Sequence, residues 1–520
     1  MDVNQTLELV RKSLATPDNS IQRTAGWQQP SSAITGLATY NLEAPAKLLY
    51  PVLSPLRNEI PRVVGQPGIQ ANWRSITGIN TAKVHPGVGE GERGASLTHT
   101  MSANTAAFKF FCMDDSVTFE SQWASKNFDD AKARATEGLL QAMMIQEEAS
   151  ILGGNTSVNY TGSGSPGTGT CGTPTVALNT ESTSAVTSGT FLVKCVALGF
   201  RGYWNLAGMN LGGVGTSLGV TLDPNDFAYV TKTNADASVD YVEGNISKIS
   251  AASAGVTIDG SHKSAYGYVT PIPGAFAYAW YTNSNSAGYF LDQITLINSA
   301  QFTTDAASAI APGANLSTNY STCTYDFDGL LTMALKSASG SYVKALATGT
   351  AGTGSKLTTN GAGGCSEIDD MCIDRWNLAR LSIDEIWLNG QQYLDIVKLV
   401  VKNGGAALIK QNVDANNMPL AIAMGLGVKS LLNPITGTEM RLRVHPLVPN
   451  GCILGKCNTI PYKLSGINEV QRMLLRQDYY AIEWPLKTRK WEFSVAFDGV
   501  LQHYFPPALG VIYNIAPGIA

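Results

Sequence analysis

The sequence predicts an α+β fold interrupted by an all-β segment, and three observations lead to this prediction. Residues 127–154 have the pattern of one long helix with a start and a stop signal. Beyond Gly154 the composition shifts to Gly, Ser and Thr, and the next stretch, on the order of 150 residues, is poor in helix formers. After Tyr325, helical and strand patterns alternate again.

Composition limits the possible classes of protein. With 520 residues and 44% hydrophobic content, the chain has room for about three domains with real cores. Only 15% of the residues are charged, against roughly 25% in ordinary soluble domains, which favours surfaces covered by neighbouring subunits. A net charge of −4 and the lack of a Lys/Arg run argue against a dedicated nucleic-acid binder. Any contact with DNA should be non-specific.

The chain has no targeting or membrane signal that we recognise. No apolar run approaches the ~18 residues of a membrane-spanning helix, and the first residues lack the apolar core of a signal peptide. Eight scattered cysteines are too sparse for a disulfide scaffold. We therefore expect a protein that is made and kept in the cytoplasm, with reduced thiols and no membrane contact.

The first part of the chain has the pattern of an arm. Residues 4–15 favour a short helix, and prolines at 45, 51, 55 and 61 then prevent long helices and central strands. The arm carries apolar side chains such as Leu49 and Leu53 but lacks the apolar mass to form a core. We expect it to lie on a neighbouring subunit.

A hairpin and the long helix follow the arm. Strands at 72–79 and 98–119 are joined by a Gly-rich tip at 85–96, which should protrude because it contains no large apolar residue. In the helix, Asn127 is the predicted cap and Gly153-Gly154 the predicted left-handed end. Roughly 25 residues at ~1.5 Å each make a rod of about 37 Å, longer than a compact domain needs.

The all-β segment begins after a Gly/Ser/Thr linker. Residues 189–204 and 274–283 have the period of strands. In the second, the large side chains Phe276, Tyr278 and Trp280 should face one way and the alternating alanines the other. This pattern is typical of a β-sandwich, which we expect to fold independently because its ends rejoin one domain.

The remaining chain mixes helices and strands. The pattern predicts a short amphipathic helix at 326–337, then a helix, a turn and a strand at 367–389. Residues 437–455 should form two strands around a turn, 467–477 a helix, and 479–515 further strands.

Candidate chemical motifs are weak. The Gly-rich tip lacks the Gly-Lys-Ser/Thr of a phosphate loop, Ser165 sits in linker and not in a nucleophile elbow, and residues 234–245 depart from a calcium loop. The histidines have no metal-ligand spacing, and packing thiols are the default for Cys452 and Cys457, with a metal or disulfide as the alternative. The acid pairs Asp369-Asp370 and Asp384-Glu385 fit helix caps better than a general acid and base. We expect no enzyme, no metal site and no cofactor.

Several segments, in order, resemble one family. They are YPVLSPLRNEIPRVVG with NWRSITGIN, QEEASILGGNT, DFDGLLTMAL, LSIDEIWLN, HPLVPNG, EWPLKTRKW and PPALGVIYNI. In this order they resemble the major capsid proteins of tailed bacteriophages, which have the Hong Kong 97-like shell fold. GAFAYAWYTN is similar to the immunoglobulin-like β-sandwich that one subgroup inserts after its long spine helix.

The resemblance implies a division of the chain. It gives an N-terminal arm at 1–57, an extended loop at 58–107, a peripheral domain with the spine helix at 108–157 and an inserted β-sandwich domain at 158–322. The peripheral domain continues at 323–357, an axial domain spans 358–475, and the C-terminal strands at 476–520 complete the core.

The resemblance also implies function and partners. The chain would assemble as hexamers and pentamers into an icosahedral head in the host cytoplasm, become part of the virion, and enclose double-stranded DNA. Scaffolding protein, portal and possible decoration proteins would be its partners. The expected assembly contacts are Leu49, Leu53, Arg57, Arg62, Glu90, Glu92 and Arg93. Some members cross-link a loop lysine; Lys83 is the nearest lysine here, but it has no matching partner asparagine.

Two other functions stay open. A cellular encapsulating shell would share the fold, although the length and the extra sandwich favour a virus. A secreted β-rich surface protein would fit the Gly/Ser/Thr-rich middle, but the first residues contain no signal peptide. Native mass separates these classes, since a shell runs in the megadalton range.

Overall fold

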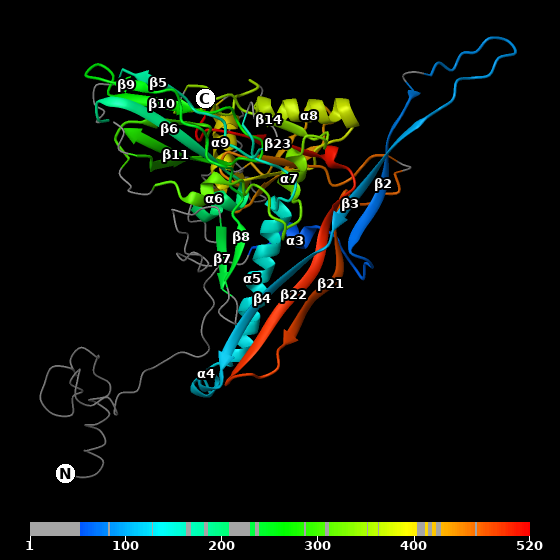
Figure 1. Cartoon of the computed structure of the whole chain (residues 1–520). Coiled ribbons are helices and arrows are strands. Elements are labelled where there is room, and N and C mark those ends of the chain that lie inside the picture. The colour runs from blue at the N-terminus through cyan, green and yellow to red at the C-terminus, as the bar shows by residue number, and fades with distance from the viewer. Residues whose placement is uncertain are drawn as a thin grey trace, which may run out of the picture.

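The computed structural model (Figure 1) describes residues 53–519 apart from residues 82–83, 127, 163–167, 181–185, 207–228, 234–238, 285–287, 307–310, 351, 362, 403–410, 414–418, 423–427 and 463–464. Most of the predicted arm, with Leu49 and the helix at 4–15, therefore lies outside the described residues, as does Lys83. The described part is a mixed α+β fold made mostly of strands, in agreement with the predicted class. None of its helices is long and apolar enough to span a membrane.

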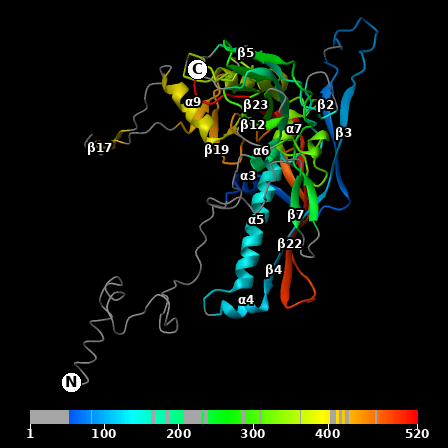
Figure 2. The same cartoon turned by 60° about the vertical axis from the view of Figure 1, so that its left-hand side comes forward.

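The long helix is α5, Ala131–Gly153, which forms the axis of the molecule's lower half (Figure 2). The predicted cap, Asn127, lies outside the described residues. Asp130 is the cap, since its carboxylate accepts hydrogen bonds from the backbone N–H groups of Lys132 at 3.0 Å and Ala133 at 3.2 Å. The helix therefore begins three residues later than the sequence pattern indicated.

The end of α5 also differs from the prediction. Gly154 has φ −56° and ψ 142°, which is not the left-handed conformation. The two glycines are required by close packing instead. A Cβ on Gly153 would lie 2.2 Å from the Phe200 ring, and one on Gly154 would lie 2.3 Å from the Phe327 carbonyl oxygen. The helix stops where other segments press against its backbone.

A four-stranded sheet in the order β1-β21-β22-β4 runs beside α5. Its strands are β1 (Arg62–Val64), β4 (Lys109–Thr118), β21 (Gln471–Glu483) and β22 (Lys490–His503). Leu139 of α5 packs on Val117, Phe493 and Val495 of this sheet, with Ala135 beside it. Ala135 and Leu139 therefore face this sheet. Helix α4 (Phe119–Ala124) closes the far end.

The prediction of a helix at 467–477 is wrong, because β21 begins at Gln471. Its residues pair with β22 over a long antiparallel ladder that starts at Gln471↔His503. Met473, Leu474 and Leu475 are all buried in the core. Tertiary pairing and burial on both faces override the local helical pattern.

The predicted hairpin is a two-stranded ribbon of β2 (Gln70–Ile79) and β3 (His99–Ala107), which projects from the molecule in Figure 1. The second strand was expected to continue to residue 119. Instead it ends at Ala107, and after Phe108 the chain enters β4, which pairs with β22. The chain thus passes from the projecting ribbon directly into the sheet beside α5.

The all-β segment contains a three-stranded sheet, β13-β10-β5, and a four-stranded sheet, β12-β11-β6-β9, with a separate hairpin β7-β8. Its elements are β5 (Thr175–Asn179), β6 (Gly189–Leu198), α6 (Phe200–Leu206), β7 (Tyr229–Thr233), β8 (Val239–Glu243), β9 (Val256–Ile258), β10 (Ser264–Tyr268), β11 (Ala277–Ser284), β12 (Phe290–Thr295), β13 (Ser299–Phe302) and η2 (Ala314–Ser317).

Strand β11 buries both of its faces. Tyr278 and Trp280 pack between the two sheets, whereas Ala277 and Ala279 face the core around the end of α5. Phe276 was expected beside Tyr278, but it precedes the strand and packs with the alanines. Because one face of the sheet belongs to a shared core, this packing argues against independent folding of the segment.

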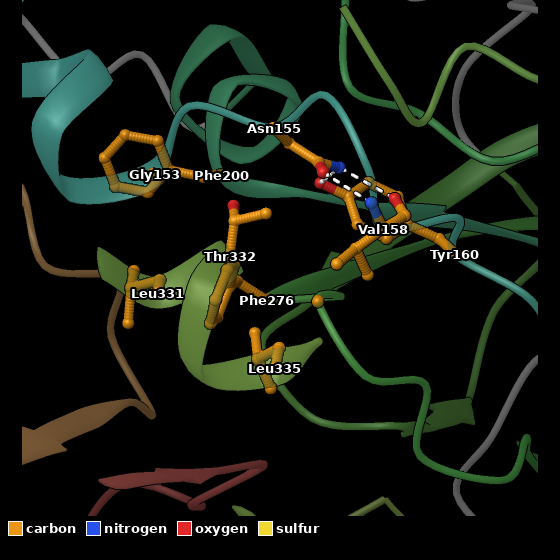
Figure 3. Close-up of a pocket in the computed structure, with 10 residues that line it drawn as sticks. Gly153, Asn155, Val158, Tyr160, Phe200, Phe276, Leu331, Thr332 and Leu335 are labelled. Carbon is orange, nitrogen blue, oxygen red and sulfur yellow. Dashed lines mark hydrogen bonds between the residues drawn. The ribbon is translucent and has the colours of Figure 1, made fainter. Parts of the chain in front are cut away.

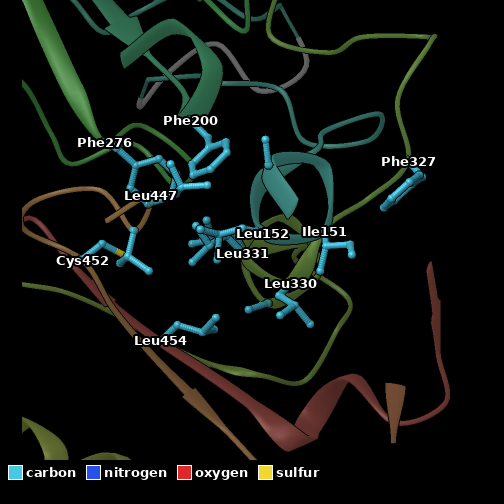
Figure 4. Packing of buried hydrophobic residues seen from close by; sticks show 14 of the residues in the cluster. Ile151, Leu152, Phe200, Phe276, Phe327, Leu330, Leu331, Leu447, Cys452 and Leu454 are labelled. Carbon is cyan, nitrogen blue, oxygen red and sulfur yellow. The ribbon is translucent and has the colours of Figure 1, made fainter. Parts of the chain in front are cut away.

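The shared core joins the three parts of the chain (Figure 4). Ile151 and Leu152 of α5 pack there with Leu330 and Leu331 of α7 (Leu330–Leu335). Phe200 reaches the same cluster from the all-β segment. Helix α7 confirms the predicted helix at 326–337, although it is buried nearly all round and not amphipathic.

The last part is a six-stranded sheet in the order β14-β23-β20-β15-β19-β18, and it confirms the helices and strands predicted at 367–389 and 437–455. Its elements, with the neighbouring helices and a small hairpin, are β14 (Tyr342–Ala345), α8 (Ser366–Ala379), β15 (Glu385–Leu388), α9 (Gly390–Lys402), β16 (Gln411–Val413), β17 (Pro419–Ile422), β18 (Ser430–Leu432), β19 (Glu439–Val444), β20 (Ile453–Lys456), η3 (Pro506–Ala508) and β23 (Leu509–Tyr513).

Candidate functional site

Helix α3 (Pro55–Glu59) is the point where the arm meets the rest of the protein. Its cap residue, Ser54, makes no side-chain hydrogen bond to the helix. Instead the buried carboxylate of Glu148, on α5, accepts hydrogen bonds from the backbone N–H groups of Leu56 at 2.9 Å and Arg57 at 2.6 Å. A carboxylate at a helix N-terminus pairs otherwise unsatisfied N–H groups and is favoured by the helix dipole. The spine helix thus supplies the cap that α3 lacks.

The neighbouring Glu147, also buried, binds two arginines of this region. Arg57 Nε lies 2.7 Å from Glu147 Oε2, and Arg62 Nη1 lies 2.5 Å from Glu147 Oε1. The Tyr479 hydroxyl donates to Glu147 Oε2 at 2.5 Å, and Arg62 also pairs with Asp478 at 2.7 Å. Two cations therefore offset two carboxylates, which removes the large cost of an unpaired buried charge.

Burial and neighbouring charges shift the pKa values of Arg57, Arg62, Tyr479 and Asp478. Burial lowers the pKa of Arg57, but the charge of Glu147 and the interactions with Tyr479 together outweigh it, and the pKa is raised overall. The same balance, with Glu147 and Asp478 as partners, raises the pKa of Arg62. Burial and then the charge of Glu147 raise the pKa of the Tyr479 hydroxyl. Burial raises the pKa of Asp478, but the hydrogen bonds from Arg62 and the Tyr479 backbone N–H, with the charges of the two arginines, together outweigh it, and the pKa is lowered.

His445 ties Glu148 to the six-stranded sheet. Its Nε2 lies 2.7 Å from Glu148 Oε1, and its Nδ1 accepts the backbone N–H of Leu447 at 3.0 Å. Because Nδ1 is an acceptor, Nε2 carries the proton and donates it to the carboxylate, so the imidazole is neutral. We call Arg57, Arg62, Glu147, Glu148, His445, Asp478 and Tyr479 the α3 junction.

The C-terminal end of α3 has a second contact with this sheet. Arg443 Nη2 lies 3.3 Å from Glu59 and 3.2 Å from Glu385, so it bridges two carboxyl groups. Burial, together with the adjacent Glu385, raises the pKa of Glu59. Burial raises the pKa of Glu385, but Glu59, Lys456 and Arg443 outweigh it and the pKa is lowered. Helix α3 is therefore fixed at both ends by charged groups of other elements.

The structure places six of the seven expected assembly contacts, and they lie in separate regions. Arg57 and Arg62 meet at the α3 junction, where they bind Glu147. Leu53 is 49% exposed just before α3, and Leu49 lies outside the described residues. The ribbon tip is distant in sequence from the α3 junction. Its charged side chains are exposed; these are Glu90, Glu92 and Arg93. Contact of any of them with another subunit stays a prediction.

Sequence reasoning missed Glu147, Glu148, Tyr479 and His445. The sequence contained a sign of Glu147 and Glu148, because they are two adjacent acids in the last turns of a helix that packs on a core. Acids in such a position need hydrogen-bond or ionic partners. No pattern in the sequence brings His445 to them, because that pairing spans 297 positions.

The passage from α5 into the all-β segment is held by Asn155 (Figure 3). Its Nδ2 donates to the carbonyl oxygens of Val158 and Ser321, each at 2.8 Å, and to the Tyr160 hydroxyl at 3.0 Å. Asn155, Tyr160 and Thr332, together with apolar side chains, line a cavity of about 10 Å³, which is about the volume that one water needs. Asn155 thus ties both ends of the segment together.

The motifs considered for chemistry have structural surroundings. Asp369 lies in the first turn of α8, as expected of a cap, whereas Asp384 accepts the backbone N–H of Asn458 at 2.8 Å. Cys452 and Cys457 are buried free thiols, with pKa values raised mainly by burial. Within the described ranges, no three His, Cys, Asp or Glu residues are grouped to hold a metal ion. Ser165 and residues 234–238 lie outside them.

No protein-family model and no curated protein matches the chain. Among solved structures it is similar to the capsid of a native GTA particle (9% identity, TM-score 0.40, 94% of this chain and 100% of that one). It is also similar to the capsid of Myoviridae phage XM1 (8%, 0.39, 93% and 99%) and to the holo-SrpI encapsulin complex of Synechococcus elongatus PCC 7942 (8%, 0.36, 91% and 93%). At these TM-scores the likenesses establish neither the fold nor the function of the chain.

Proposed function

We propose that the chain is a shell-forming protein, the major capsid protein of a tailed bacteriophage, which assembles through hexamers and pentamers around double-stranded DNA. In this proposal residues 58–107 are the extended loop, 108–157 and 323–357 the peripheral domain, 158–322 the inserted immunoglobulin-like domain and 358–475 the axial domain. Scaffolding protein, portal and possibly a decoration protein are partners during assembly in the host cytoplasm. The chain performs no catalysis in this role.

The observation that carries the proposal is the surface of the β2–β3 ribbon. Ile76 and Met101 are directly opposite in the ladder, and each is 65% exposed. In the described part of the chain, β2 and β3 form a sheet of their own. An isolated two-stranded ribbon is marginally stable in water, and side chains as large as these contribute about 1.5–3 kcal/mol each when buried. A neighbouring subunit supplies the missing surface.

The α3 junction supports the same function. A ribbon that projects from a subunit can hold a neighbour only if its base is fixed. That base is β1 and α3, whose arginines bind Glu147 of α5. Force applied to the ribbon or the arm therefore reaches the spine helix through buried ion pairs. An enzyme or a surface adhesin has no evident need for this arrangement.

The test is assembly of the purified protein. Native mass spectrometry or light scattering should find megadalton particles, and Ile76→Asp should reduce them at least tenfold because it places a charge on the apolar pair. Asn72→Asp is the matched control, since it adds the same charge at an exposed polar position of the same strand. A protein that stays monomeric under all assembly conditions would contradict the proposal. Particles purified from cells that contain protein cargo and no DNA would identify an encapsulating shell instead.

A further inference from the structure

A second surface lies at the opposite end of α5 from the α3 junction. An open hollow of about 600 Å³ is lined by Gln122, Trp123, Lys126, Phe128, Asp129, Asp130 and Trp491. It lies where α4, the start of α5 and the start of β22 meet at the lower end of the molecule in Figure 1. Trp123 is 62% exposed there. We call it the α4 hollow.

The α4 hollow has the lining of a binding site for an extended peptide. Trp123 and Trp491 line the hollow, and the Phe119 ring supports them, at 4.1 Å from the ring of Trp491 and 6.2 Å from that of Trp123. Within the described residues, the buried Oε1 atom of Gln122 has no hydrogen-bond donor. Proline-rich extended segments dock in aromatic-lined grooves, and a backbone N–H of a non-proline residue in such a segment can donate to Gln122 Oε1.

We propose that residues 43–52 of the same chain run back along α5 and place Pro45 in the α4 hollow. This segment, EAPAKLLYPV, directly precedes Leu53, where the described structure begins. Its two prolines favour an extended conformation. The segment and the hollow belong to one molecule, so this docking differs from the expectation that the arm lies on a neighbouring subunit, and it does not require a shell.

The segment has the length that this path needs. Glu148, which caps α3, and Asp130, which caps α5, are separated by about 27 Å of helix at ~1.5 Å per residue. The eight residues from Pro45 to Leu53 span about 26–29 Å when extended. The segment is therefore just long enough for Pro45 to reach the α4 hollow if it runs straight along α5.

The charges and apolar side chains of the segment also match the path. Its charged residues are Glu43 and Lys47, and the lining of the hollow includes charges of both signs, Lys126, Asp129 and Asp130. Between the hollow and α3, Leu140 of α5 is 38% exposed, which gives Leu48 and Leu49 an apolar surface to cover. Burial of these leucines contributes more than the ion pairs, since exposed pairs are worth about 0–1 kcal/mol.

Disulfide trapping in the full-length protein tests the docking. The double variant Lys47→Cys with Lys126→Cys should form an intrachain disulfide under mild oxidation, seen as a monomer of altered mobility on a non-reducing gel and as one linked peptide pair by mass spectrometry. The two single variants control for reaction with Cys112, which is partly exposed. Lys12→Cys with Lys126→Cys controls for random collision of a mobile segment.

Each outcome of this experiment either supports the proposed docking or overturns it. Trapping that falls at least fivefold when Trp123→Ser is added would support recognition by the aromatic lining of the hollow. A disulfide-linked dimer would overturn the proposal in favour of a neighbouring copy as the occupant. Trapping no stronger than in the Lys12 control would overturn the docking altogether. In the last two cases megadalton particles from the same sample would show that the proposed shell function stands on its own.

Discussion

Replacing Glu147 with glutamine probes the α3 junction most directly. The side chain keeps its shape but loses its charge, and its amide would offer an N–H₂ donor to groups that are themselves donors. Glu147 accepts three hydrogen bonds, from Arg57, Arg62 and Tyr479, and each hydrogen bond to a charged group is worth about 1.5–3 kcal/mol. Glutamine retains one acceptor oxygen.

The two arginines regain some hydration, because their side chains are 15% and 18% exposed. The expected net loss is therefore about 3–5 kcal/mol, the range for breaking a buried ion pair. Urea unfolding of the unassembled subunit at neutral pH measures it. Glu137→Gln is the matched control on the same helix, since Glu137 pairs with Arg134 but is 50% exposed, and its loss should be about 0–1 kcal/mol. Equal losses for the two variants would refute the assignment of the junction as a buried anchor.

Other predictions follow from particular sites. Burial lowers the pKa of His503 to about 4. As the pH falls from about 6.5 to 4, His503 is therefore protonated in the unfolded state but not in the folded state. The free energy of unfolding should decrease over this range by ~1.4 kcal/mol per pH unit. His503→Gln should flatten that slope relative to wild type in unfolding titrations, and an unchanged slope would count against burial of a neutral ring. Gly153→Ala should destabilise the subunit by more than 1 kcal/mol despite its better helix propensity, because the Cβ meets the Phe200 ring at 2.2 Å; a higher melting temperature would contradict this. In assembly assays Leu53→Asp, like Leu49→Asp, should reduce particle yield far more than Glu92→Ala or Arg93→Ala, and ~1 M salt, with a Debye length of ~3 Å, should leave particles intact; particles that dissociate in salt would reverse the ranking.

Much of the architecture was predictable from local pattern. The apolar spacing of α5 and the alternation in β11 are local signals, and both gave the correct element. The prediction of a helix at 467–477 was wrong because these residues form a strand that is buried on both faces. A strand of that kind can have the same spacing of apolar and charged residues as a helix. The start of α5 was predicted a few residues too early, because Asp130 is the residue that caps the helix.

The candidate site was less accessible from the sequence than the fold. Arg57 and Arg62 were selected for their place beside the arm, yet their partner on α5 lies 85 or more positions away. Long-range pairing of buried charges depends on tertiary geometry that residue types alone do not encode. An acid pair in a helix face that packs, such as Glu147-Glu148, is the local sign of such a site.

The two-sided burial of β11 has a practical consequence for peptide display on this protein. Replacing the all-β segment would uncover the apolar end of α5, so foreign sequences belong in an exposed turn and not in place of strands. The turn between β9 and β10 is suitable, because a Cβ on Gly260 would meet no atom within 4 Å. Lengthening a loop costs only about 0.6 kcal/mol for each doubling. An epitope of several residues should be carried there with little loss of stability.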